Sequence, residues 1–394
     1  MKPQQVVWPS FYPAFSCIGP ACSDNCCHDW PITLDRDTYL RYKQLPPGGL
    51  SDISARSLFP TGGSKTHFAS IRLDPGGLCP YQDPDGGCKL VRRLGPDALG
   101  LVCTLYPRRK TEFLPGVWEL TLSLSCEEAL RLGVLSPDRV RFQLAEIQPD
   151  TALQTLPSTG IGPGGAVVPP PSWAQALRQG CLRLMGRRDI PISQRILAIG
   201  LLLDRISNTP ESQISGLCAA FSQIAGAQLE SLTQALKPPR AALLQAWLLP
   251  ISHILAGRPG PLRDRLSALL PQRNTLDREG AAVCLELVRK QADPFLAAHS
   301  RETENYFTNH LFSAMFPFLG SPKDLSYPAA ALAEQFALLR LLTALSLPGE
   351  PEQVLTKAMV HLARMVQHTD QTQDLIQLSR QLGQDPRVLR TCYL

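Results

Sequence analysis

The spacing of hydrophobic positions changes near the middle of the chain. After Trp173, apolar residues recur every three or four positions, as in PISQRILAIGLLLDRISN, where Ile196, Ile199 and Leu203 follow a proline near the start. This spacing puts apolar side chains on one face of a helix. The same pattern predicts further helices over residues 211–236, 239–256, 276–291, 294–318, 327–346, 351–368 and 371–383. We therefore expect an all-helical domain over residues 173–394, with no fixed-period repeat.

The first 150 residues keep neither a helical nor a strand spacing for long. Turns rich in proline, glycine and aspartate are frequent, as in LDPGGLCPYQDPDGGC, and only short stretches such as VWELTLSLSC are typical of strands. Residues 151–172 contain prolines and glycines that exclude a helix and a central strand, so we predict a linker there. The predicted fold class is mainly α: an irregular cysteine-rich metal-binding domain over residues 1–150, then the linker and an all-α multi-helix domain.

Composition and charge narrow the class of protein. The chain has 394 residues, of which 44% are hydrophobic and 19% charged, and its net charge of +5 is spread along the sequence. This balance is typical of a soluble globular protein rather than of a nucleic-acid binder. The N-terminus lacks the apolar stretch of a signal peptide, and no run reaches the roughly 18 apolar residues that span a bilayer. We expect a cytoplasmic protein that binds neither nucleic acid nor membrane.

The twelve cysteines indicate metal or redox chemistry, because most of them fall in the first third of the chain. A chain of this length can bury a core without disulfides, and disulfides are rare in a reducing cytoplasm. Six of these cysteines follow the ordered series CxxxCC, CPY, C and CxxYPR. The six are Cys22, Cys26, Cys27, Cys79, Cys88 and Cys103. Cys17 and Cys126 lie outside that series and are less secure members of a site.

Thiolates are soft ligands that suit zinc or an iron–sulfur cluster, so the six cysteines are the predicted metal ligands. Adjacent Cys26 and Cys27 point in different directions in most backbone conformations, and we expect one of the two to bind. We predict an iron–sulfur cluster of the 4Fe-4S type. A structural zinc site is the alternative, and a disulfide framework is the least favoured explanation.

The cysteine segments also carry a resemblance. FSCIGPACSDNCCHDWPITLD, CPYQDPDGGCKL, CTLYPR and SLSC closely resemble the bacterial flagellin lysine-N-methylase family, and ETENYFTNHLFSAMFPF resembles its ENY-containing helix. The resemblance is densest over residues 6–130, and its CxxxCC region is shared with small proteins thought to chelate zinc or iron. It implies methyl transfer from S-adenosylmethionine to lysines of a protein substrate, with a cysteine-held iron–sulfur cluster. In members of the family that have been studied, the substrate is flagellin.

Methyl transfer to lysine requires a neutral amine, whereas a free lysine ammonium has a pKa of about 10.4. Oxygen atoms that accept this proton or position the amine are therefore candidates for the catalytic site. These candidates are Asp24, Asp29, Tyr81, Tyr106 and Glu304. We retain Tyr81, Tyr106 and Glu304 as the catalytic hypotheses.

The sequence offers little for the methyl donor. Arg108, with Arg109 beside it, is the candidate for binding a carboxylate of the donor or balancing the charge of a cluster. The segment STGIGPGGAV is glycine-rich, but a nucleotide-binding loop must follow a strand and open a helix. Pro163 lies inside this segment and three prolines follow it, so we exclude it as a cofactor loop.

Three functions remain open at this point. The first is a protein-lysine N-methyltransferase that acts on a protein with surface lysines, with flagellin as the candidate partner. The second is a non-catalytic protein-interaction module stabilised by zinc or an iron–sulfur cluster. The third is an electron-transfer or redox-sensing protein, which would need a reversible redox couple at an accessible potential.

Overall fold

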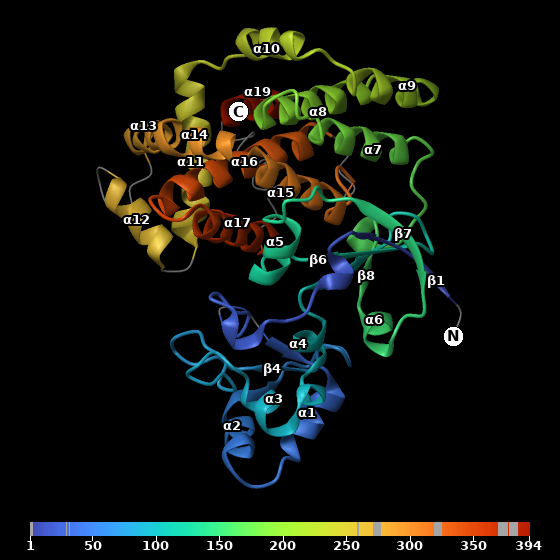
Figure 1. Cartoon of the computed structure of the whole chain (residues 1–394), viewed down its shortest axis with the longest axis vertical. Helices are drawn as coiled ribbons and strands as arrows, with labels where there is room; N and C mark the ends of the chain where they lie inside the picture. Colours follow the sequence, from blue (N-terminus) through green and yellow to red (C-terminus); the bar gives the residue numbers. More distant parts are fainter. Residues whose placement is uncertain are drawn as a thin grey trace.

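A computed structural model describes residues 3–28, 30, 32–257, 260–270, 277–318, 325–368, 377 and 385–394. Across these residues the fold is mainly helical, as predicted, with two small β-sheets in the N-terminal part. Figure 1 shows the helices gathered into one body and a separate lobe formed by much of the N-terminal third. The helix predicted over residues 371–383 lies outside the described residues, apart from residue 377.

A five-stranded sheet has the strand order β7-β1-β6-β5-β8. Its strands are β1 (Gln4–Pro9), β5 (Arg108–Thr111), β6 (Trp118–Leu122), β7 (Phe142–Ile147) and β8 (Ser158–Thr159). β1 is antiparallel to β7 and parallel to β6, while β5 is antiparallel to β6. The predicted strand in VWELTLSLSC is confirmed as β6. Because β1 lies in the same sheet as β5 and β6, the chain between them leaves the sheet as the lobe and then returns.

The lobe has a small core of its own around a three-stranded sheet of order β2-β4-β3. Its elements are β2 (Ile32–Leu34), α1 (Arg36–Lys43), α2 (Gly49–Ser57), β3 (Leu58–Pro60), β4 (Ala69–Ile71), α3 (Lys89–Leu94) and α4 (Leu101–Leu105). Asp35 caps α1 by accepting a hydrogen bond from the Thr38 N–H at 2.8 Å. The prediction of an irregular N-terminal domain was therefore wrong in part, because strands of three residues are too short to set up a visible alternation.

The helical body packs around one central helix, α16 (Ser326–Ser346). Its other elements are α5 (Glu127–Gly133), α7 (Ala174–Met185), α8 (Ile192–Ile206), α9 (Glu211–Phe221), α10 (Gly226–Ala235), α11 (Arg240–Ala256), α12 (Pro261–Leu269), α13 (Arg278–Leu287), a π-helix (Val288–Ala292), α14 (Asp293–Ala298), α15 (Ser300–Ser313), α17 (Pro351–His368) and α19 (Pro386–Tyr393). α16 lies against α8, α17 and α19. Length and composition alone would let α16 cross a membrane, but its apolar window is entirely buried within the protein.

Two predicted helices are divided in the structure. The helix predicted over residues 211–236 is split into α9 and α10, and the one predicted over residues 294–318 is split into α14 and α15, which ends at Ser313. The first break precedes Gly226, where a Cβ atom would lie 3.0 Å from the Ile190 side chain, which is tighter than most Cβ contacts. The second break is at His299, whose φ of −111° and ψ of 39° are not helical. Neither break has a proline at the turn, so the sequence pattern runs through both.

The predicted linker is attached to the sheet. It contains α6 (Thr151–Thr155) and the edge strand β8, which pairs with β5. The N–H of Gly160 donates to the Gly165 carbonyl at 2.8 Å, and a Cβ atom on Gly160 would lie 2.4 Å from the Ala166 carbonyl oxygen. Only glycine at position 160 allows these two segments of the backbone to approach this closely. The division of the chain into residues 1–150, 151–172 and 173–394 stays a prediction.

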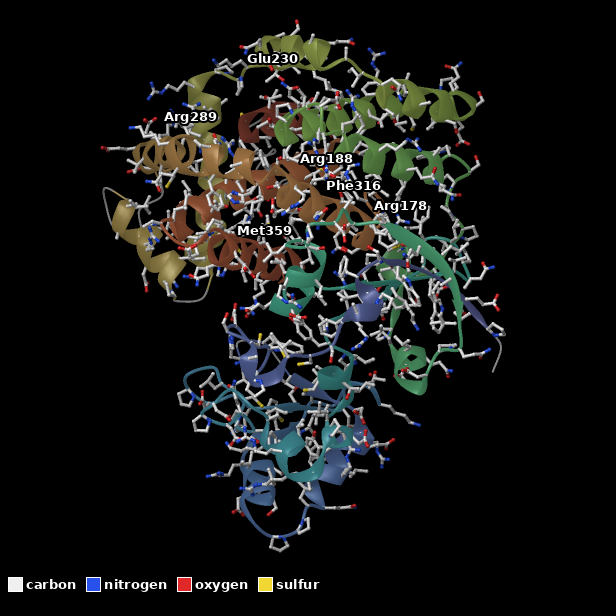
Figure 2. The ribbon with its side chains drawn as sticks, in the orientation of Figure 1. Arg178, Arg188, Glu230, Arg289, Phe316 and Met359 are labelled. Carbon is white, nitrogen blue, oxygen red and sulfur yellow. The ribbon has the colours of Figure 1, made fainter. Side chains whose placement is uncertain are left out.

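A buried ion pair joins the sheet to the helical body. Arg178 of α7 binds both carboxylate oxygens of Glu119 on β6, at 2.5 and 2.8 Å, and donates to the Phe312 carbonyl at 2.8 Å. Both charged side chains are only 8% exposed. Figure 2 shows Arg178 at the edge of the helical body that lies beside the sheet. A charge buried this deeply is stable only while its partner is present.

Replacing Arg178 with methionine should therefore lower the free energy of unfolding by about 3–5 kcal/mol, because Glu119 would be left buried and unpaired. Urea denaturation followed by circular dichroism measures the change. The matched control is Lys290→Met, which removes an exposed pair with Glu286 whose side chains are 71% and 58% accessible. That control should cost less than about 1 kcal/mol. Equal losses in the two variants would contradict the role of the buried pair.

A partly buried histidine makes the fold sensitive to acid. Burial and, to a smaller extent, the charge of Arg109 lower the pKa of His310 on α15 to about 4. An unfolded histidine has a pKa of about 6.5, so below that pH the unfolded chain binds more protons than the folded one. Stability is therefore lost as the pH falls from about 6.5 toward 4.

Between pH 7.5 and pH 5.5, this site should remove about 1 kcal/mol of stability from the native protein. The variant His310→Gln should lose that part of the pH dependence, because glutamine does not titrate. Urea midpoints at the two pH values measure the difference, with His67→Gln as the control at an exposed position. A pH dependence that is unchanged in His310→Gln would refute the assignment.

Candidate functional site

Backbone pairing brings the cysteine segments of the lobe together. The N–H of Cys79 donates to the Cys27 carbonyl at 2.7 Å, and His28 forms a bridge pair with Leu78. The turn after Cys79 closes through a second bridge between Gln82 and Cys88. Cys103 comes from the short helix α4 and packs, with Cys27 and Cys88, against the small core that includes Cys79.

Four thiols from these segments influence one another. Burial raises the pKa of Cys103, and the neighbouring thiols of Cys26, Cys79 and Cys88 raise it further. Burial also raises the pKa of Cys79 to about 11, with smaller contributions from Cys88 and Cys26. Without a cation, burial and the neighbouring sulfur atoms both favour the protonated thiols of Cys79 and Cys103. A metal ion would reverse that preference.

The other two cysteines of the predicted set lie differently. The Cys22 thiol is 3.4 Å from a carboxylate oxygen of Glu127. Burial raises the pKa of Cys22 to about 12, with Glu127 and Cys126 adding to the effect. The Cys27 thiol shares a hydrogen bond with that of Cys26, and this bond is the main cause that raises the pKa of Cys26. Cys22 therefore faces α5 and Cys126 rather than Cys79 and Cys103.

The thiols are neighbours but not a preformed ligand set. In the part of the chain that the structure describes, no three His, Cys, Asp or Glu side chains are arranged to hold one metal ion. All 12 cysteines are free thiols, which leaves no disulfide framework.

Two helices of the body clamp the loop that carries Cys22 and Cys26. Glu127, at the start of α5, accepts hydrogen bonds from the Ser23 N–H at 2.9 Å, the Ser23 hydroxyl at 2.8 Å and the Asp24 N–H at 3.0 Å. Arg364 of α17 pairs with the Asp24 carboxylate at 2.8 Å and donates to the Asp24 carbonyl at 3.2 Å. The loop is thus held from one side by an anion and from the other by a cation.

Asp24 is the centre of this clamp. Burial alone would raise the pKa of Asp24, but the hydrogen bond with His28 and the charge of Arg364 together lower it. The His28 ring lies 3.1 Å from the same carboxylate. Asp24 is therefore held as a carboxylate between a residue of its own loop and a residue of α17.

Both predicted tyrosines lie beside the cysteines, Tyr81 buried and Tyr106 half-buried. The hydroxyl of Tyr106 lies 3.0 Å from that of Ser125, and its ring lies 5.6 Å from the Trp30 ring. Burial raises the pKa of Tyr106, and Cys126 and Cys26 add to this effect. The hydroxyl of Tyr81 lies 2.7 Å from that of Ser54 in the core of the lobe. The other predicted helper, Asp29, lies outside the described residues.

The ENY motif lies inside the helical body. Glu304 is buried and pairs with Arg195 at 2.9 Å, Arg188 at 3.0 Å and Arg139 at 3.4 Å. Asn305 donates to the carbonyls of Val134 and Asp138 at 3.3 and 3.0 Å, and its amide oxygen accepts from the Val140 N–H at 3.3 Å.

Tyr306 is also fully enclosed, with 2% of its surface exposed. The motif thus fixes α15 to the segment that links α5 with β7. Ion pairs account for Glu304, hydrogen bonds account for Asn305 and packing accounts for Tyr306 without a substrate.

Arg108, the candidate for the methyl donor, lies over the Phe15 ring at 5.2 Å. Burial raises the pKa of Tyr12 to about 12, and the charge of Arg108 opposes this shift. Arg108 therefore faces the short helix Tyr12–Ala14 at the end of β1.

Sequence reasoning missed the two clamp residues. Glu127 directly follows the SLSC segment, so its position beside a predicted site was a usable signal. Arg364 is 340 positions from Asp24, and no pattern in the sequence connects the two. The contact depends on how α17 packs against the lobe, which only the three-dimensional structure shows.

A family model described as the FliB lysine N-methylase C-terminal domain matches residues 178–383, more than half of the chain. The flagellar biosynthetic protein FliU of Salmonella muenchen is 34% identical over 139 residues, which are 35% of this chain and 82% of FliU. No solved structure matches the chain.

Two curated proteins named lysine-N-methylase, from Salmonella choleraesuis and Salmonella typhimurium, are also 34% identical over 139 residues. The match spans only 34% of the length of each of them and 35% of this chain. The family model nevertheless covers the helical body from α7 through α17. The chain therefore belongs to the FliB lysine N-methylase family, as its cysteine segments and ENY motif predict.

Proposed function

We propose that the protein is an S-adenosylmethionine-dependent protein-lysine N-methyltransferase with a cysteine-held iron–sulfur cluster. The observation that carries the proposal is the family match over residues 178–383. Two relatives bear the name lysine-N-methylase, and a third is named as a flagellar biosynthetic protein. These names support methylation of lysines on a protein substrate, and they make flagellin the first substrate to test. We further propose that the reaction takes place in the cytoplasm.

The proposed ligands of the cluster are four cysteines. They are Cys26, Cys79, Cys88 and Cys103. Their proximity within the lobe and their soft sulfur donors fit an iron–sulfur cluster, with zinc as the alternative. A 4Fe-4S cluster bound there would join three segments of the lobe and supply a one-electron redox centre. Cys22 and Cys27 would lie next to the ligands rather than among them.

Arg364 supports this assignment through its charge. The hydrogen bond with Cys27 and burial raise the pKa of Cys26, whereas the charge of Arg364 opposes both effects. The guanidinium thus favours the thiolate that a metal ligand must become. The same residue binds Asp24, so one side chain of α17 both holds the loop and balances the charge of the proposed centre.

The assignment of S-adenosylmethionine as the methyl donor rests on the family resemblance alone. S-adenosylmethionine would supply the electrophilic methyl group. Arg108 lies over Phe15, and the glycine-rich segment forms the sheet edge at β8, so neither supports a donor site. Among the catalytic hypotheses, Tyr106 is the one whose neighbours include Cys26 and Arg364. Glu304 is occupied by its three arginines.

One observation favours a second candidate function. The hydroxyls of Tyr81 and Tyr106, the carboxylate of Glu304 and the amide of Asn305 all take part in hydrogen bonds or ion pairs of the fold, as expected of structural residues. In a non-catalytic protein-interaction module stabilised by zinc or an iron–sulfur cluster, these residues would have only this structural role. The test must therefore measure metal and methylation separately.

The decisive experiment purifies the protein without oxygen after co-expression with flagellin. We expect iron and acid-labile sulfide in the protein, and a donor-dependent mass gain of one methyl group per modified lysine. Cys79→Ser and Cys103→Ser should lose the iron, whereas Cys126→Ser and the buried control Cys181→Ser should keep it. Zinc in place of iron would refute the cluster. Metal without methylation of any lysine would favour the interaction module.

A second variant tests the clamp. Arg364→Gln removes the ion pair with Asp24 and the positive charge beside Cys26, so a bound cluster should be lost to a chelator several-fold faster. Lys357→Gln removes an exposed cation from the same helix and is the matched control. The loss of the absorbance near 400 nm measures the rate of release. Equal rates in the two variants would exclude a role for Arg364 in holding the centre.

A further inference from the structure

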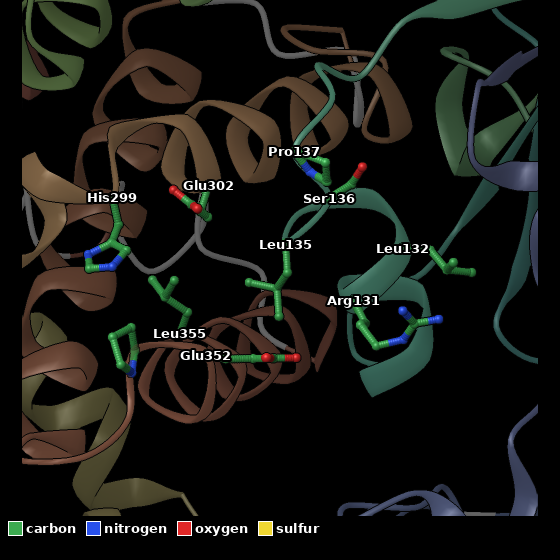
Figure 3. Close-up of a pocket in the computed structure, with 10 residues that line it drawn as sticks. Arg131, Leu132, Leu135, Ser136, Pro137, His299, Glu302, Glu352 and Leu355 are labelled. Atoms are coloured by element: carbon green, nitrogen blue, oxygen red, sulfur yellow. The ribbon is translucent and has the colours of Figure 1, made fainter.

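A cavity of about 460 Å³ opens between α5, α15 and the first turn of α17. Leu132 and Leu135 form one apolar wall, and Leu355 forms the floor. Figure 3 shows His299 and Glu302 on one side, Arg131 and Leu132 on the opposite side, and Glu352 between them. Its size lies within the range of about 300–1,000 Å³ that is usual for small-ligand sites. The cavity is separate from the cysteine group and from the ENY residues.

The ionic groups at the cavity include one more carboxylate than guanidinium. Arg131 is bound by Glu128 through two hydrogen bonds of 2.7 Å each, so its guanidinium is already paired. Glu302 is 9% exposed and pairs with Arg301 at 2.5 Å. Glu352 is exposed at the rim, and its charge acts on Arg131. Among these five residues, three carboxylates face two guanidiniums, so the cavity favours a cation.

His299 adds a hydrogen-bond acceptor. Its Nδ1 atom lies 2.8 Å from the Phe295 carbonyl oxygen, which can only accept a hydrogen bond. Nδ1 must therefore carry the proton, and in the neutral ring Nε2 keeps its lone pair. The ring is fixed by stacking on Phe295, with the centroids 4.3 Å apart. The described residues provide no hydrogen-bond donor to Nε2.

We propose that this cavity takes the side chain of the substrate lysine. This inference rests on the proposed function, and it assigns the place where the amine of the substrate lysine binds. The leucines would cover the four methylenes, while Glu302 and Glu352 would attract the terminal ammonium. A methyl donor fits less well, since Arg131 is already paired and the only aromatic ring in the lining, that of His299, is stacked on Phe295.

His299 is the proton acceptor in this arrangement. A proton would pass from the ammonium nitrogen of lysine to Nε2 of His299, which leaves the lone pair on the amine. The charged groups of the lining and their ion-pair partners are Glu302 and Arg301 on α15, Arg131 and Glu128 on α5, and Glu352 on α17. The apolar wall favours the neutral amine, because desolvation disfavours the ammonium form.

The first test measures binding alone, on the full chain purified without oxygen. The probes are N-acetyl-lysine amide and N-acetyl-norleucine amide, which have nearly the same shape but differ in charge. The wild-type protein should bind the lysine probe about 10-fold more tightly, as expected for a charge-assisted hydrogen bond. Glu352→Gln should remove most of that preference, and the exposed control Glu286→Gln on α13 should keep it. Equal binding of the two probes by the wild type would overturn the proposal.

The second test uses the methylation assay. Glu352→Gln should raise KM about 10-fold with little change in kcat, because it removes attraction for the amine. His299→Asn keeps a donor for the Phe295 carbonyl but lacks Nε2, so it should lower kcat at least 10-fold. If the wild type methylates and neither variant differs from Glu286→Gln, the pocket is wrong while the proposed function stands. If the lysine probe binds selectively but no lysine is methylated, the proposed function fails and the cation site stands.

Discussion

The arrangement of the molecule depends on one ionic contact between distant parts of the chain. Asp24 lies in the loop that carries Cys22 and Cys26, and Arg364 of α17 binds its carboxylate at 2.8 Å. Glu127 of α5 holds the backbone of the same loop from the other side. Because the two helices present opposite charges, the loop is fixed in position as well as in orientation. The two contacts together tie this loop of the lobe to the helical body.

Ion pairs between separate elements also occur within the helical body and where it meets the sheet. Buried charges occur where elements meet: Arg178 with Glu119 joins α7 to the sheet, and Arg195 with Glu304 joins α8 to α15. Each pair is satisfied by at least two contacts, as buried charges require. These pairs give the interfaces a single register, which an apolar surface of leucines and alanines would specify less strictly. The central helix α16 is such an apolar surface along most of its length.

The sequence predicted the helical body well, because its helices are long and their apolar faces recur clearly. The limits of α11, α16 and α17 differ from the prediction by one residue or less at each end. The sheet was harder to predict, since β1 pairs with strands more than 100 positions away and β7 exposes Leu144 at 70%. For the candidate site, the cysteine series was visible in the sequence. The Asp24–Arg364 contact was not, because it depends on how α17 packs.

The position of β1 has a consequence for the order of folding. Val6 pairs with Trp118, so this contact closes a loop of more than 100 residues. An unstructured loop of that length carries a large entropic penalty, which falls when part of the loop is already compact. The lobe has its own core, so its collapse would shorten the effective distance between β1 and β6. The cysteine lobe would then act as a folding aid for the sheet from which it emerges, and a ligand that stabilises the lobe would also promote closure of the sheet.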